Sequence, residues 1–426
     1  MSPPRGLIIA APASGSGKTT VTLGLLRALS RAGIDVRGAK SGPDYIDPAY
    51  HAAACGRPCL NLDAWAMTPD LLCARASGDG LLLIEGAMGL FDGAPPDGRG
   101  ATADLARLLG YPVVLVVDAA RMAQSIAPLV AGFAACDPDV RIAGVILNRV
   151  GSDRHARMLR RALAPSGLPV LGCLPRTDGI ARPSRHLGLV QAQEDPALDA
   201  FLDRVADTVA TCIDLGALRD LATCGPDVTP ARTTPPAQRI AVAQDAAFSF
   251  FYPHQRADWQ AAGAEVIAFS PLADDPVPQA DLIYLPGGYP ELFAAQLSSA
   301  NRFLSSLRNA AQNTDIYGEC GGFMALGQAV TDADGVIHPM AGLLDLHTSF
   351  AQRKLHLGYR HLHAEHGPMA GRWAGHEFHY ATTLHARGQP LFAAHDAEGT
   401  ALPDMGLVAG RVAGSFAHLI DRTDAP

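Results

Sequence analysis

The chain of 426 residues lacks a long hydrophobic run, an excess of basic residues and a paired cysteine motif. No stretch approaches the roughly 18 uncharged apolar residues that a membrane helix requires, so we expect no membrane partner. Lysine and arginine total 34 against 42 acidic residues, a net charge of −8 without runs of like charge. We therefore expect no nucleic-acid partner, and any anionic ligand must be held by local positive potential.

The cysteines are far apart in the chain and form no C-x-x-C pair. The first apolar run is short and predicts a buried strand, not a secretory signal, so we expect free thiols in the reducing cytoplasm. Cys55 and Cys59 leave open a metal or redox site, although two further ligands do not lie nearby. The eight cysteines are Cys55, Cys59, Cys73, Cys136, Cys173, Cys212, Cys224 and Cys320.

Length and composition indicate a globular chain of two domains, with 48% hydrophobic and 18% charged residues. Short apolar runs alternate with helical patterns up to about Leu174, and continuous runs such as 112–118 are typical of parallel strands buried on both faces. Residues 223–238 are rich in Thr, Pro and Gly, after which the same rhythm restarts. We predict two doubly wound α/β domains, 1–222 and 239–426, joined by a linker at 223–238. The predicted strands are 7–11, 36–39, 81–84, 113–117, 145–147 and 170–174, then 240–243, 265–269, 281–285 and 315–318.

A glycine-rich turn lies between the first strand and the helical pattern 21–32. Backbone N–H groups of such a turn surround phosphate oxygens, a lysine reaches the outer phosphates and a hydroxyl binds Mg²⁺. Ala11 and Pro12 occupy the place of the upstream glycine of the Walker pattern, and a structural turn with an incidental lysine is the alternative. We predict an ATP-binding P-loop formed by Ser14, Gly15, Ser16, Gly17, Lys18, Thr19 and Thr20.

Carboxylates follow two neighbouring strands in turn-rich segments. Glu85 ends one strand and Asp92 lies just beyond it, while Asp44 and Asp47 belong to the segment 40–48. The carboxyl ends of parallel strands share one edge of a sheet, where α/β proteins bind ligands, and Mg²⁺ prefers oxygen donors. Singly, each residue would be a turn former or helix cap; beside a P-loop, we interpret them as functional.

Cys320 lies between a predicted strand and a predicted helix, within Gly-Glu-Cys-Gly-Gly. A sharp turn there would project the thiol from the sheet edge, and the helix N-terminus would lower its pKa. The N–H groups of Gly321 and of Gly288, in a second glycine pair, would stabilise an oxyanion. We therefore predict a cysteine nucleophile with an oxyanion hole.

Fifteen histidines are candidates for the base that serves this cysteine. Most lie between His338 and His395, yet no H-E-x-x-H motif occurs, and His376 and His379 have the wrong spacing for two metal ligands on one helical face. His418 lies near the end of the second domain, whose last strands could carry a base back to the turn at Cys320. We therefore predict His418 as the base.

These stretches, in this order, resemble the cobyrinic or hydrogenobyrinic acid a,c-diamide synthase family. That family joins a dethiobiotin-synthetase-like P-loop domain to a class I glutamine amidotransferase-like, flavodoxin-like domain. The resemblance covers nearly the whole chain. Its most specific stretches are 42–48 with His51, 85–93, 285–291, 318–322 and 375–380.

The resemblance implies that ATP and glutamine convert the a and c acetate carboxylates of a corrin acid into amides. Glutamine attacked by Cys320 would release ammonia, which would displace phosphate from an acyl phosphate and would need a path protected from bulk water. Its implied site residues are Thr19, Glu85 and Asp92 for Mg²⁺, Asn148 for adenine, and Asp44, Tyr45 and Asp47 for the acyl phosphate and substrate. Asn148 as a strand-end turn residue is the alternative.

The chain departs from class I amidotransferases after the histidine. They carry a glutamate two residues later, where this chain has Ile420, followed by Asp421. Either the cysteine and histidine work as a dyad or another group orients the imidazole. A cobyric acid synthase-like enzyme, a nucleotide-switch protein and a structural protein are the alternatives for the whole chain, and we expect a homodimer.

Overall fold

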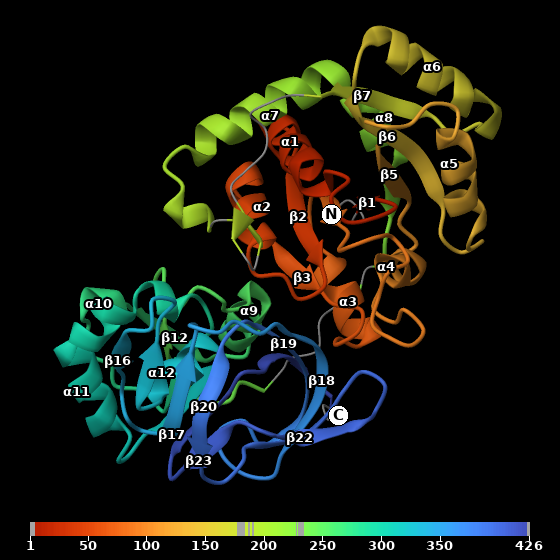
Figure 1. Cartoon of the computed structure of the whole chain (residues 1–426). Coiled ribbons are helices and arrows are strands. Elements are labelled where there is room, and N and C mark those ends of the chain that lie inside the picture. Colours follow the sequence, from red (N-terminus) through yellow and green to blue (C-terminus); the bar gives the residue numbers. More distant parts are fainter. Residues whose placement is uncertain are drawn as a thin grey trace. The chain divides into compact units, whose positions relative to one another are not determined.

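The computed structural model describes residues 5–176, 184–185, 188–189, 191–226, 228 and 234–423. The chain divides into two compact units, Met1–Ala231 and Arg232–Pro426, whose elements are labelled in Figure 1. Each unit is built on a largely parallel sheet with helices. The predicted α/β class is therefore confirmed for both.

The sheet of the first unit has its strands in the order β3-β2-β4-β1-β5-β6-β7, all parallel. The P-loop strand β1 is central, between β4 and β5, and its residues Leu7, Ile8 and Ile9 are completely buried. Burial on both faces explains why these strands are continuous apolar runs. The strands are β1 (Arg5–Ala10), β2 (Val36–Ser41), β3 (Leu60–Leu62), β4 (Leu81–Glu85), β5 (Val113–Asp118), β6 (Ile142–Val150) and β7 (Val170–Pro175).

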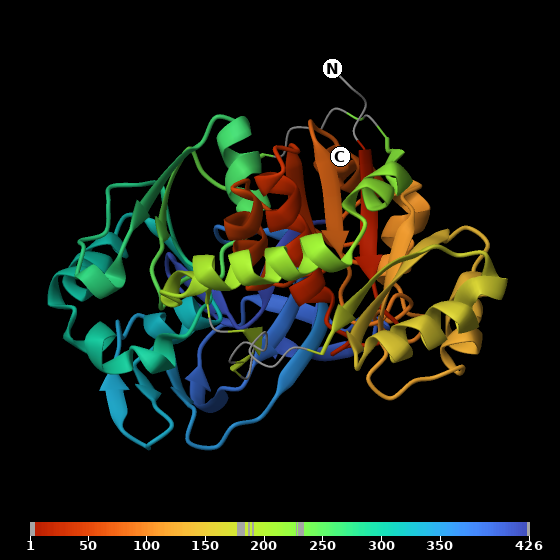
Figure 2. The same ribbon diagram turned by 90° about the horizontal axis from the view of Figure 1, so that it is seen from above.

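Helices α1 and α7 pack side by side in this unit (Figure 2). Arg27 of α1 forms an ion pair with Asp203 of α7 at 2.8 Å, and the buried residues of both helices cover the sheet. The helices are α1 (Lys18–Arg31), α2 (Asp47–Cys55), α3 (Pro69–Ala76), α4 (Thr102–Leu109), α5 (Ile126–Ala135), α6 (Asp153–Leu163), α7 (Leu198–Cys212) and α8 (Leu215–Leu221).

Part of the segment expected to be a linker belongs to the sheet. Thr223–Cys224 form β10, which is antiparallel to the start of β1, with Arg5 opposite Cys224. β5 pairs with β1 only from Ile8 onward, so the residues of β1 before Ile8 can pair with β10 on that side. A two-residue strand is too short to appear as a periodic pattern in the sequence.

The sheet of the second unit has the order β12-β11-β13-β14-β24-β23, with β23 antiparallel at one edge. The first four strands agree with the predicted ranges to within one residue. The elements are β11 (Arg239–Ala243), β12 (Glu265–Phe269), β13 (Leu282–Leu285), β14 (Asp315–Glu319), β23 (Leu407–Ala409), β24 (Val412–Ser415), α9 (Pro253–Ala261), α10 (Ala294–Ser299), α11 (Asn301–Ala310) and α12 (Gly321–Leu326).

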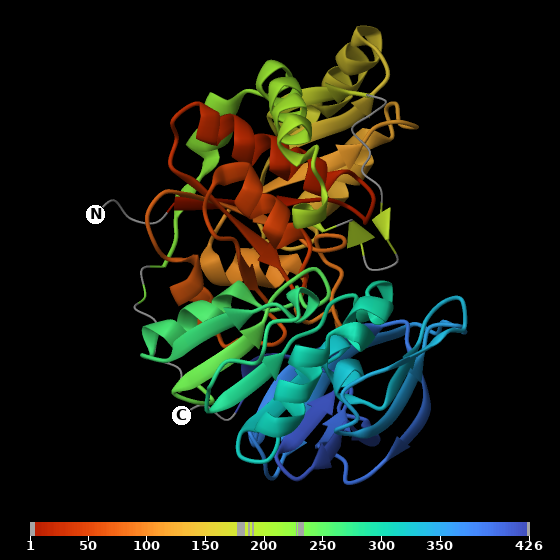
Figure 3. The same ribbon diagram turned by 90° about the vertical axis from the view of Figure 1, so that its left-hand side faces the viewer.

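Two further sheets, largely antiparallel and not predicted from the sequence, follow α12. Their strands are among those drawn in blue in Figure 3. Many of their residues are half-exposed and polar, so they lack the apolar runs by which the parallel strands were predicted. The strands are β15 (Ala329–Thr331), β16 (Ile337–Pro339), β17 (Asp345–Ser349), β18 (His356–Ala364), β19 (Gly371–His379), β20 (Thr382–Arg387), β21 (Phe392–His395), β22 (Ala401–Met405) and β25 (His418–Arg422).

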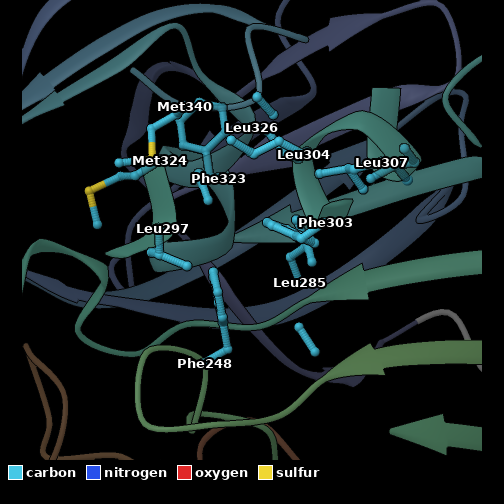
Figure 4. Close-up of a cluster of buried hydrophobic side chains, with 14 of the residues drawn as sticks. Phe248, Leu285, Leu297, Phe303, Leu304, Leu307, Phe323, Met324, Leu326 and Met340 are labelled. Atoms are coloured by element: carbon cyan, nitrogen blue, oxygen red, sulfur yellow. The ribbon is translucent and has the colours of Figure 1, made fainter. Parts of the chain in front are cut away.

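A hydrophobic core supports the turn that carries Cys320. Phe323 and Met324 of α12 pack with Leu285 of β13 and Phe303 of α11, all at most 3% exposed (Figure 4). Burying a side chain of this size contributes about 1.5–3 kcal/mol. The helix directly after Cys320 is thus anchored on the sheet. Across the part of the chain that the structure describes, no helix is long and apolar enough to cross a membrane.

Candidate active site

The glycine-rich turn of the first unit leads from β1 into α1. Gly17 has φ 94°, a conformation that favours glycine, and a Cβ there would lie 2.2 Å from Nδ2 of Asn148. That amide donates a hydrogen bond to the Ser16 carbonyl at 2.9 Å. Ser14 and Gly15 are exposed. The turn therefore has the backbone conformation that a phosphate loop needs, with Asn148 as its support.

Lys18 is buried at the base of this turn and its ammonium donates to the Met88 carbonyl. Burial lowers the pKa of Lys18, as does the charge of Lys40, whereas the carboxylates of Glu85 and Asp47 oppose the shift. The lysine is thus enclosed by charged groups from neighbouring strand ends.

Lys40 joins the carboxylates that the sequence predicted at this edge of the sheet. Its Nζ lies 2.6 Å from Oδ2 of Asp47 and 2.9 Å from Oε1 of Glu85, and the same Glu85 oxygen accepts from Thr19 Oγ1 at 2.6 Å. The other Glu85 oxygen lies 2.5 Å from Nε2 of His51. Thr19, Asp47 and Glu85 are therefore brought together as expected.

The charges in this network stabilise one another. Burial opposes the charge of Lys40, but Asp47 and Glu85 raise its pKa. Burial likewise opposes ionisation of Glu85, but Lys40 and His51 lower its pKa. For Asp47, burial and the charge of Asp44 raise the pKa to about 6. The site therefore holds a fixed cation beside Glu85, which it keeps ionised, and beside Asp47, whose ionisation it makes less favourable.

Sequence reasoning missed Lys40, although a signal was present. Lys40 and Glu85 each follow a predicted strand, and β2 pairs with β4 so that these two residues are opposite each other. With the order of the predicted strands known, Lys40 and Glu85 could therefore have been predicted as a charged pair at adjacent strand ends.

Replacing Lys40 with methionine is expected to lower the free energy of unfolding by about 3–5 kcal/mol, because the buried carboxylates of Asp47 and Glu85 would lose the cation that both contact. Urea unfolding of the full chain measures the change. Arg31→Met is the matched control, since Arg31 pairs with Asp207 at 2.9 Å on the exposed surface and is expected to cost at most about 1 kcal/mol. Equal losses in the two variants would contradict a compensating role for Lys40.

The remaining predicted residues of the first unit shape loops around this network. Oδ1 of Asp44 accepts from the N–H groups of Ile46 and Asp47 at 2.7 and 3.0 Å, and Tyr45 beside it is half-buried. Oδ2 of Asp92 accepts from the Gly89 N–H at 2.9 Å. In the structure, Asp44 and Asp92 thus make the backbone contacts of turn residues, while Asp92 also acts electrostatically on Lys18.

A cavity of about 140 Å³ lies beside the glycine-rich turn. Its wall combines apolar side chains of α7 with polar groups at the end of β6. Such a wall would suit a planar nucleobase whose edges form hydrogen bonds. The lining residues are Gly17, Thr20, Val21, Asn148, Arg149, Leu174, Pro175, Val205, Thr208 and Val209.

Cys320 occupies a strained turn in the second unit, directly between β14 and α12. Its φ of 46° and ψ of −100° are rarely adopted by a residue with a side chain. Its N–H donates to the Ser415 carbonyl at 2.8 Å, and its carbonyl accepts from Met324 at 3.0 Å. These bonds hold the sharp turn that displays a nucleophile in hydrolase-like folds.

The two predicted oxyanion donors lie next to each other. The Gly288 nitrogen is 3.1 Å from the place that a Cβ on Gly321 would occupy. Gly287 gives room for the histidine, because a Cβ on it would lie 2.3 Å from Cε1 of His418. The structure therefore brings the glycine pair, the turn at Cys320 and His418 to one sheet edge.

His418 is 1% exposed at the start of β25. Its Nδ1 lies 3.7 Å from Oε2 of Glu319, and its ring stacks on that of His376 with centroids 5.0 Å apart. Ile420, which occupies the position of the usual glutamate, is buried in the core. Sequence reasoning missed Glu319 as a neighbour of the imidazole, since the two are far apart in the chain.

The thiol pKa differs from the sequence expectation. Burial, followed by the charge of Glu291, raises the pKa of Cys320, and these effects outweigh the Gly321 N–H, which lowers it. Burial, followed by the charge of His376, lowers the pKa of His418. The expected lowering of the thiol pKa is wrong, because burial and the charge of Glu291 disfavour the thiolate more than the Gly321 N–H favours it. Burial thus favours the neutral forms of both the thiol and the imidazole.

The clustered histidines, except His366, lie on strands. In β19, His379 Nε2 is 3.4 Å from Oε1 of Glu377, whose other oxygen accepts a hydrogen bond from Arg360 at 2.8 Å.

In the first unit, Sγ of the buried Cys59 lies 3.4 Å from Nδ1 of His51. Among the residues that the structure describes, no group of three or more His, Cys, Asp or Glu side chains could hold a metal ion. A metal site at Cys55 and Cys59 is therefore not supported.

Comparisons with known proteins match both units. Residues 7–190 match the CobQ/CobB/MinD/ParA nucleotide binding domain, and residues 239–425 match the CobB/CobQ-like glutamine amidotransferase domain. The hydrogenobyrinate a,c-diamide synthase of Brucella anthropi is 54% identical over 430 residues, which cover 98% of this chain and 98% of that protein. The enzyme of the same name from Rhodobacter capsulatus is 53% identical over 431 residues, covering 98% and 99%.

Proposed function

Since the chain belongs to the hydrogenobyrinate a,c-diamide synthase family, we propose that it amidates the a and c acetate carboxylates of hydrogenobyrinic or cobyrinic acid. It is a ligase that forms C–N bonds with ATP and with glutamine as amide donor, in cobalamin biosynthesis. The observation that carries the proposal is the pairing, in one chain, of a phosphate loop with a strained cysteine turn next to a glycine pair that packs against a histidine.

Glutamine cleavage uses residues of the second unit. The sulfur of Cys320 attacks the side-chain amide carbon while His418 takes the thiol proton, and the carbonyl electron pair moves to oxygen, where the N–H groups of Gly288 and Gly321 stabilise it. When the C–N bond breaks, His418 gives the proton to the leaving ammonia. Water then releases glutamate from the thioester.

Amide formation uses residues of the first unit. A corrin carboxylate attacks the γ-phosphorus of ATP, ADP leaves, and ammonia displaces phosphate from the acyl phosphate. The positive charge of Lys18 offsets the charge that develops on the phosphoryl oxygens, and Asp44, Tyr45 and Asp47 position the substrate. The loop Ser14–Thr20 binds the phosphates and Asn148 binds the adenine. These residues belong to a synthase domain at 1–222, which residues 223–238 join to a glutaminase domain at 239–426; the first two of the joining residues pair with β1.

Thr19, Glu85 and Asp92 would hold Mg²⁺. The hydroxyl of Thr19 and the carboxylate of Glu85 already meet at 2.6 Å, and oxygen donors of this kind fit the preference of Mg²⁺. When bound, the ion would offset phosphate charge. Chelation with EDTA is expected to stop ATP-dependent amidation and to leave glutamine hydrolysis unchanged; an equal loss of both would contradict this division of labour.

Product mass spectrometry tests the proposal. The protein is incubated with ATP, Mg²⁺ and glutamine and with hydrogenobyrinic or cobyrinic acid in turn. Each acetate converted from acid to amide lowers the mass by about 1 Da, so two conversions are expected. No mass change with either corrin acid would contradict the assignment, and amidation at other side chains would favour a cobyric acid synthase-like activity.

A cytoplasmic homodimer is part of the same proposal. All eight cysteines are free thiols, of which Cys136 and Cys224 are exposed, and this supports a reducing compartment. Analytical ultracentrifugation is expected to give twice the 44.5 kDa mass of one chain. A single-chain mass across the concentration range would contradict the dimer.

A further inference from the structure

A buried carboxyl group lies beside the base of the glutaminase site. Oε2 of Glu319 is 3.7 Å from Nδ1 of His418, and both residues are 1% exposed. Oε1 of Glu319 accepts the N–H of Leu419 at 3.0 Å, which ties the carboxyl to the strand that carries the histidine. We infer that Glu319 positions the imidazole of His418 during glutamine cleavage, an assignment that rests on the proposed function.

The contact leaves the other ring nitrogen for catalysis. With Nδ1 facing Glu319, Nε2 is the nitrogen that takes the proton of Cys320 and later gives it to ammonia. The distance of 3.7 Å exceeds a hydrogen bond, but such contacts often tighten when substrate binds. In its ionised form Glu319 stays ionised through this step and stabilises the imidazolium by its charge.

The acidic residue nearest to His418 in sequence is held by a hydrogen bond from its own strand. Asp421 lies beyond a bulge in the pairing of β25 with β19, and its Oδ1 accepts from the N–H of Arg422 at 3.0 Å. Ile420 is apolar and buried. The carboxyl group therefore comes from the residue preceding the nucleophile, not from the strand of the base.

The surroundings of Glu319 make its charge effective. The groups facing it are the hydroxyls of Tyr284 on β13 and Tyr317 on β14, and the imidazole of His418, on which His376 of β19 stacks. Among the described residues, no lysine or arginine forms an ion pair with Glu319. Burial raises the pKa of Glu319 to about 8, so its ionised fraction changes near neutral pH. An uncompensated carboxylate attracts an imidazolium strongly.

Replacing Glu319 with glutamine tests the inference, because the amide oxygen can still accept the Leu419 N–H while the charge is lost. The kcat of glutamine hydrolysis is expected to fall at least about tenfold, with less than about a threefold change in KM and unchanged ammonia-dependent amidation. Glu319→Asp keeps a carboxyl and is expected to recover part of kcat.

The pH profile separates positioning from a structural role. In the wild-type protein the kcat of glutamine hydrolysis is expected to rise with pH through about 8, because the ionised carboxylate above its pKa stabilises the imidazolium. The Glu319→Gln protein is expected to lack this rise. A merely structural glutamate would change amplitude but not the shape of the profile.

Asp421→Asn is the matched control, and its kcat is expected to equal that of the wild-type protein. The inference alone would be overturned by an unchanged kcat in Glu319→Gln, by an equal loss of kcat in Asp421→Asn, or by a rise of kcat with pH that persists in Glu319→Gln. A wild-type protein unable to cleave glutamine would overturn the proposed function as well. If Glu319→Gln does not fold, the wild-type protein and Glu319→Asp are measured instead. The inference is overturned if the wild-type kcat does not rise with pH, or if Glu319→Asp keeps the wild-type kcat at every pH.

Discussion

Replacing Cys320 with serine is expected to abolish glutamine-dependent amidation and to leave ammonia-dependent amidation intact. The loss should be at least about 10³-fold, since removing a covalent nucleophile eliminates the route to the acyl-enzyme. Serine is nearly the same size but a much weaker acid than cysteine, and burial lowers the pKa of His418, so the imidazole is a poor base for a hydroxyl. Steady-state rates with glutamine and with ammonium chloride measure the two activities.

Cys136→Ser is the matched control for this experiment. Cys136 is an exposed thiol in the first unit, and its replacement should change neither activity. If Cys320→Ser keeps the glutamine-dependent rate, the nucleophile is another residue. If it also loses the ammonia-dependent rate while its unfolding transition is unchanged, then Cys320 serves the synthase reaction as well, contrary to our proposal.

Replacing Lys18 with glutamine is expected to lower both the glutamine-dependent and the ammonia-dependent amidation by about 10²-fold to 10³-fold. Lys18 is a buried cation in a site that holds Lys40 and several carboxylates, so its loss would remove positive charge next to the phosphoryl group. Because Cys320 and His418 belong to the other unit, glutamine hydrolysis should continue. Phosphate release and glutamate release, assayed separately, measure the two outcomes.

Arg31→Gln is the matched control for Lys18. It removes a positive charge from the same helix α1, but at its far end, where Arg31 pairs with Asp207 on the surface. Both activities should remain within about twofold of the wild-type values. A Lys18→Gln protein that amidates at the wild-type rate would rule out the phosphate role of the lysine.

Several features of the site were predictable because they are contiguous in the chain. A strand, a glycine turn and a helix follow one another both at Lys18 and at Cys320, and the structure shows β1 with α1 and β14 with α12 at these places. The meeting of Glu85 with Thr19 was also predictable, since strand ends of a parallel sheet share one edge. The antiparallel sheets after α12 were not predictable, because their half-exposed strands carry no continuous apolar pattern.

The sequence by itself determined the α/β class, the two loops and the order in which they occur, because local turn chemistry and apolar runs specify them. Only the tertiary structure decided which distant side chains face one another: Lys40 between Asp47 and Glu85, and Glu319 beside His418. It also decided that burial raises the pKa of Cys320, where the local motif predicted a lower value. Burial and charge pairing depend on groups that the fold brings together from separate strands, and no spacing along the chain encodes them.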